Sequence, residues 1–116
     1  MADPTVWQRV LSWILPTDAE KRVGQDERLH ELTRALERDP ESAASYVSRG
    51  EVLVQIGEHN AAARDFRRAL GLAEAQFKTQ PWGVVAQAVR DRALRGLKLA
   101  QELSGVNRVG QKTGKG

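Results

Sequence analysis

The chain has 116 residues, of which 41% are hydrophobic and 28% charged, and its net charge is +3. That length supports one small core, and the absence of cysteine excludes a disulfide framework and thiolate metal sites. No apolar run approaches the roughly 18 residues of a membrane span, and the N-terminus lacks the basic start of a secretory signal, so we expect a cytoplasmic protein.

An amphipathic helix is predicted within residues 1–16. Asp3 can cap it, and Pro4 suits its first helical position. Its apolar side chains recur at helical spacing: Val6, Trp7, Val10, Leu11, Ile14 and Leu15. We predict that residues 1–16 form an N-terminal amphipathic helix outside the main helical domain.

The same helix concentrates apolar surface, because it holds two of the three tryptophans and one basic residue, Arg9. We expect it to pack on the rest of the chain, since large apolar stripes on monomers are normally covered. Two alternatives stay open: pairing with a second copy of the chain, and contact with a membrane surface, although its polar face lacks the Lys and Arg array of membrane-surface helices. In both alternatives the contact residues are Trp7, Leu11, Trp13 and Ile14.

A second helix is predicted to follow directly. Thr17 and Glu20 form a capping box at its start. The helix extends to Arg38, with a bend or break expected at Gly24, and the Asp-Pro pair at 39–40 closes it.

A third and a fourth helix are predicted to form a hairpin. Ser42 caps the third helix, which ends near Ile56, and Gly57 supplies the positive φ that ends it. Asn60 is the expected N-cap of the fourth helix, over residues 61–77.

The fifth predicted helix starts at the Thr-Gln-Pro segment 79–81 and ends at Glu102 or Leu103, where Ser104 and Gly105 act as a stop signal. Residues 105–116 carry three basic and no acidic side chains, so we expect a disordered basic tail. The predicted fold is therefore all-α, with about five helices.

A spaced set of small and large apolar residues marks the hairpin: Tyr46, Gly50, Leu53, Gly57, Ala62, Phe66 and Ala69. Gly50 removes a side chain where a neighbouring backbone could approach, opposite the small residues Ala62 and Ala69. The order and spacing over residues 43–76 resemble the tetratricopeptide repeat (TPR) family. Arg49 and His59 depart from the family pattern, which usually has Leu and an aromatic residue at those two positions.

The resemblance continues upstream, where residues 32–40 look like the second half of a preceding repeat. It implies a helical domain over residues 17–104, in which antiparallel helical hairpins stack and the second and fifth helices cap the open faces of the repeat. On the fifth helix, the side predicted to face the hairpin carries Trp82, Val85, Val89, Ala93, Gly96, Ala100 and Leu103.

The resemblance also implies a function, namely a non-enzymatic interaction module or adaptor that binds a peptide or helix of a partner protein. The inner face of the repeat would carry Val47, Glu51, Val54 and Gln55 as partner-binding residues. Because this face has one acid and no cation, a clamp for a terminal carboxylate is disfavoured, and an apolar segment with a basic residue is favoured.

A second hypothesis is a nucleic-acid or ribosome-associated factor that uses the basic tail and the arginines of the fourth and fifth helices: Arg64, Arg67, Arg68, Arg90, Arg92 and Arg95. Interleaved Asp65 and Asp91 favour a solvated face, so a nucleic-acid partner is the weaker expectation. The sequence contains no phosphate-binding loop, nucleophile motif or metal-ligand spacing, and we expect no catalytic residue, no metal and no cofactor.

Overall fold

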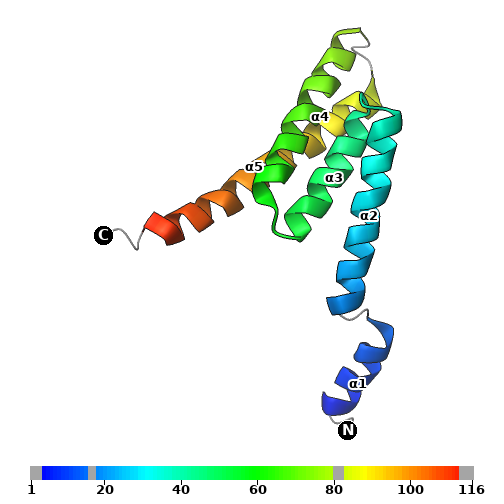
Figure 1. Cartoon of the computed structure of the whole chain (residues 1–116), viewed down its shortest axis with the longest axis vertical. Helices are drawn as coiled ribbons and strands as arrows, with labels where there is room; N and C mark the ends of the chain where they lie inside the picture. The colour runs from blue at the N-terminus through cyan, green and yellow to red at the C-terminus, as the bar shows by residue number, and fades with distance from the viewer. Residues whose placement is uncertain (1–3, 16–17, 80–82, 113–116) are drawn as a thin grey trace.

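The computed structural model describes residues 4–15, 18–79 and 83–112, without the side chains of residues 4, 12, 18 and 106–112. Within these ranges the chain is all-α and contains no strand, which confirms the predicted fold class. Its helices are α1 (Pro4–Ile14), α2 (Asp18–Arg38), α3 (Ala43–Gln55), α4 (His59–Thr79) and α5 (Val84–Lys112) (Figure 1).

The α3–α4 hairpin begins and turns where the sequence predicted. The hydroxyl of Ser42 accepts a hydrogen bond from the backbone N–H of Ser45 at 3.2 Å, so Ser42 is the N-cap of α3. Gly57 has a φ of 88° and supplies the left-handed residue after the helix. Asn60, however, is not the cap of α4: the helix begins at His59, and the Ala62 N–H already donates to the Glu58 carbonyl at 2.9 Å.

Phe66 of α4 lies at the centre of the core, with no solvent exposure. Its ring is held between glycines of two other helices, Gly50 of α3 and Gly96 of α5. A Cβ added to Gly50 would lie 2.8 Å from the ring, and one added to Gly96 would lie closer still. The space at Gly50 is therefore filled by an aromatic ring rather than by a neighbouring backbone. The buried cluster comprises Ala43, Val47, Ala62, Ala63, Phe66, Ala69, Ala73, Val89, Ala93 and Ala100.

The two remaining long helices cover the hairpin on different sides. α5 packs along α4 and against part of α3, through the buried residues Val89, Ala93 and Ala100. Val85, predicted on the same stripe, is 77% exposed, and Trp82 lies outside the described residues. α2 packs against α3 through its C-terminal half, where Leu32 and Leu36 are buried.

Within the described residues, the backbone of α1 does not pack against α2, α3, α4 or α5, so the expected packing of this helix on the rest of the chain is wrong for this structure. The cause lies in α2, which continues through Gly24 without a break and carries the chain away from the hairpin (Figure 1). The Cα radius of gyration is accordingly 18.4 Å, against about 13 Å for a compact chain of this length.

α5 is longer than predicted and continues past Leu103 to Lys112. Gly105 does not adopt a positive φ, so the stop signal expected there does not operate, and most of the segment predicted as a disordered tail is helical. The proposed caps at Asp3 and Thr17 and the chain after Lys112 lie outside the described residues. None of the helices, within the part of the chain described, combines the length and the apolar character that crossing a bilayer requires.

Candidate interaction groove

An ion pair fixes the two helices of the hairpin to each other. Arg49 of α3 donates through Nε to Asp65 Oδ2 at 2.7 Å and through a second nitrogen to Oδ1 at 2.8 Å. The Asp65 residue is 6% exposed, and the guanidinium also lies over the Tyr46 ring. Hydrogen bonding to Asp65 raises the pKa of Arg49, although burial acts in the opposite direction. Arg49 therefore remains charged and holds α3 in register with α4.

A groove of about 640 Å³ runs between α3 and α5, a size within the usual range for binding pockets. Phe66 and Gly96 lie at its base, and Val54 and the 46% exposed Leu99 form its apolar sides. Its polar edge consists of Glu51, Gln55, Arg92 and Arg95. The groove thus combines an apolar centre with charged groups on its margin.

The charges of this groove are already partly matched. Arg92 of α5 donates to Glu51 Oε1 of α3, which ties the two walls together. Arg95 makes no ion pair within the described residues, so the groove presents one cation in excess. A partner with an acidic residue therefore suits the groove better than the basic partner predicted from Glu51 alone.

Three of the four predicted partner-binding residues line this groove: Glu51, Val54 and Gln55. Val47 does not, because its side chain is fully buried in the core. Apart from Phe66 of α4, the remaining groove residues come from α5, and sequence reasoning missed them as partner-binding residues, because it treated that helix as a cap.

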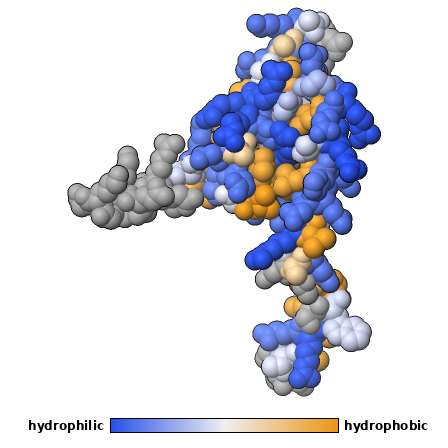
Figure 2. Space-filling view, in the orientation of Figure 1, coloured by the Kyte–Doolittle hydropathy of each residue, from blue (hydrophilic) through white to orange (hydrophobic). Residues whose placement is uncertain are grey.

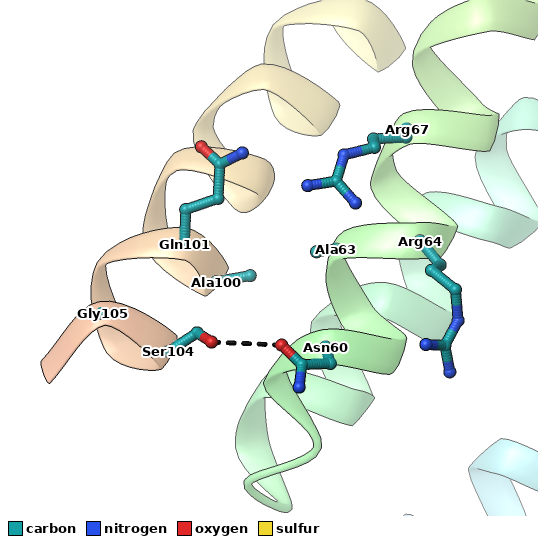
Figure 3. A pocket seen from close by; sticks show the side chains of 8 residues that line it. All are labelled: Asn60, Ala63, Arg64, Arg67, Ala100, Gln101, Ser104 and Gly105. Carbon is teal, nitrogen blue, oxygen red and sulfur yellow. Dashed lines mark hydrogen bonds between the residues drawn. The ribbon is translucent and has the colours of Figure 1, made fainter. Parts of the chain in front are cut away.

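A second cleft, of about 610 Å³, lies between α4 and α5 (Figure 3). Ala63 and Ala100 form its floor, and Ser104 Oγ donates to Asn60 Oδ1 at 3.1 Å across one end. Arg67 extends from α4 toward α5, whereas the side chain of Arg64 points away from α5 in this view. Asn60, predicted as a helix cap, thus links two helices instead.

The arginines considered for nucleic-acid binding do not share one surface. Arg64 and Arg67 line the α4–α5 cleft, whereas Arg92 and Arg95 line the α3–α5 groove, and Arg90 lies over the Phe77 ring. Asp65, interpreted from sequence as part of a solvated face, is buried. This distribution provides no continuous basic stripe along the described surface of α4 and α5.

The residues predicted for self-association or membrane contact are all exposed on α1. Trp7 is 60% exposed, Leu11 49%, Trp13 92% and Ile14 71%. No helix of the described chain covers them.

Comparison with known proteins yields no match: no family model, curated protein or solved structure resembles this chain closely enough to be matched.

Proposed function

We propose that α3 and α4 form a TPR-like unit and that the chain is a non-enzymatic adaptor, which binds a peptide or helical segment of a partner protein. The observation that carries this proposal is the α3–α5 groove, where apolar walls flank a base formed by Phe66 and Gly96. An amphipathic segment bound in such a groove would place its apolar side chains between the two helices. The absence of cysteine agrees with a reducing, cytoplasmic setting.

The groove favours a partner that contains an acidic residue. Leu99 and Val54 offer apolar contact, and Arg95, which has no ion pair among the described residues, offers a guanidinium at the margin. A carboxylate of the partner would bind Arg95, and the preformed helical walls would need little rearrangement. The Glu51–Arg92 pair bridges the two walls at the polar edge of the groove.

The test is selection of short peptides from a random displayed library against the immobilised chain, followed by affinity measurements in solution. We expect enriched peptides with apolar residues at helical spacing and an Asp or Glu. Leu99→Glu should weaken their binding by about tenfold or more, which corresponds to about 1.4 kcal/mol.

Leu94→Glu is the matched control, because Leu94 is 42% exposed on the same helix and lines neither the groove nor the cleft. It should leave affinity within about twofold. Peptides that bind wild type and Leu99→Glu equally would contradict the proposal. The same affinity measurement with an RNA oligonucleotide tests the second hypothesis. RNA binding that is lost at moderate salt and is unchanged by Leu99→Glu would support the nucleic-acid hypothesis instead.

A further inference from the structure

α1 has more exposed apolar surface than any other part of the described chain. Six apolar side chains of α1, and Leu15 directly after it, are between 42% and 92% exposed: Val6, Trp7, Val10, Leu11, Trp13, Ile14 and Leu15. The helix projects from the body beyond the N-terminal end of α2, where the molecule narrows (Figures 1 and 2). A contiguous apolar face of this kind normally marks an interaction surface.

The face is too broad for a single neighbouring helix. At 3.6 residues per turn, the six apolar side chains within α1 cover an arc of about 160°, from Trp13 round to Leu11, whereas a two-stranded coiled coil buries only two positions in seven. A helix of 11 residues is also marginal in water without tertiary packing. Several neighbours must therefore cover α1 at once, as in a helical bundle.

The exposed apolar area of α1 and its low positive charge favour protein neighbours over an anionic membrane. Trp7 and Trp13, 60% and 92% exposed, offer roughly 300 Å² between them, because one buried aromatic side chain contributes about 150–250 Å². With five aliphatic side chains added, the face approaches the roughly 800 Å² per partner of a standard interface. An anionic membrane is a poorer match, since Arg9 is the one cation of α1 and already interacts within the chain.

We propose that the α1 helices of several copies of this chain pack together into a bundle and hold the copies in a homo-oligomer. Each α1 presents an apolar hollow of about 340 Å³, lined by Arg9, Val10, Trp13 and Ile14, in which a side chain from a facing helix can insert. Because α1 packs against no other described helix of its own chain, bundling requires no rearrangement of the packing of α2–α5.

Sedimentation equilibrium of the full chain tests this proposal. We expect a mass of three or more chains of 12.9 kDa each, together with blue-shifted tryptophan emission, because Trp7 and Trp13 become buried. Leu11→Asp should reduce the mass to that of one chain and red-shift the emission. Its far-UV circular dichroism should show that α2–α5 remain folded, since no contact with them is lost.

The matched control is Gln8→Asp, which introduces the same charge on α1 at an exposed position outside the apolar face. It should retain the oligomer. A monomeric wild type, a dimer, or an oligomer that survives Leu11→Asp would each overturn the bundle. Co-sedimentation of the wild type with phosphatidylcholine vesicles in preference to self-association would overturn it in favour of a lipid surface.

Discussion

Phe66 is the residue on which three helices converge, and two glycines provide the room for its ring. Replacing Gly50 with Ala places a methyl group against the ring, and the buried ring has little space to move. We expect Gly50→Ala to lower the free energy of unfolding by about 1–3 kcal/mol, and Gly96→Ala by at least as much. Urea denaturation followed by circular dichroism measures both.

Gly71 provides the control for this prediction, because it is also helical but an added Cβ meets nothing within 4 Å. Gly71→Ala should raise the free energy of unfolding by about 0.5–1 kcal/mol, through helix propensity alone. If all three substitutions were stabilising, the Phe66 ring would not fill the space beside Gly50 and Gly96.

The Arg49–Asp65 pair makes a second prediction at the residue scale. Asp65→Ala leaves Arg49 without its partner, and because the Arg49 side chain is 25% exposed, water replaces part of the lost interaction. We expect a loss of about 2–3 kcal/mol in the free energy of unfolding. Glu31→Ala breaks the exposed pair with Arg28 and should cost at most about 0.5 kcal/mol.

The pH dependence of this effect follows from the raised pKa of Arg49. A cation whose pKa is raised on folding contributes stability that is complete below its unfolded pKa and that decreases only as the pH rises through the folded pKa; for Arg49 both values lie far above neutral pH. The cost of Asp65→Ala should therefore be equal at about pH 7 and pH 9. A cost that fell over this interval would show that Arg49 loses its proton there.

Local chemistry made some features predictable and left others out of reach. Ser42 and Gly57 act on their immediate neighbours, so their roles could be inferred from a few residues of sequence. Asp65 pairs with Arg49, 16 positions away, and Gly96 packs against the Phe66 ring on another helix. These contacts form only when the helices pack together, so they could not be inferred from neighbouring residues in the sequence. The α5 side of the groove was missed for the same reason.

At the scale of whole helices, α5 and α1 contribute differently to stability. α5 covers Phe66 and buries Ala93 and Ala100, whereas α1 packs against no other helix in the described part of the chain. A chain ending at Thr79 should lose cooperative unfolding in urea, because removal of α5 exposes the centre of the core. A chain lacking residues 1–15 should keep the urea midpoint of the full chain to within experimental error. If both truncations changed the urea unfolding transition equally, α5 and α1 would not differ in their contribution to stability.

The whole molecule combines a folded body, α2–α5, with a projecting helix, and the two should respond separately to protein concentration. If α1 bundles without touching the body, association adds nothing to the stability of α2–α5, and the melting temperature of the body should stay constant while the mass rises. If α1 instead docked on the body of another copy, a concentration hundredfold above the dissociation constant would add about 2.7 kcal/mol. For a domain of this size that gain raises the melting temperature by roughly 10 °C or more. Thermal melts across a dilution series, read by circular dichroism alongside sedimentation, therefore distinguish a bundle of α1 helices from an exchange of α1 between bodies.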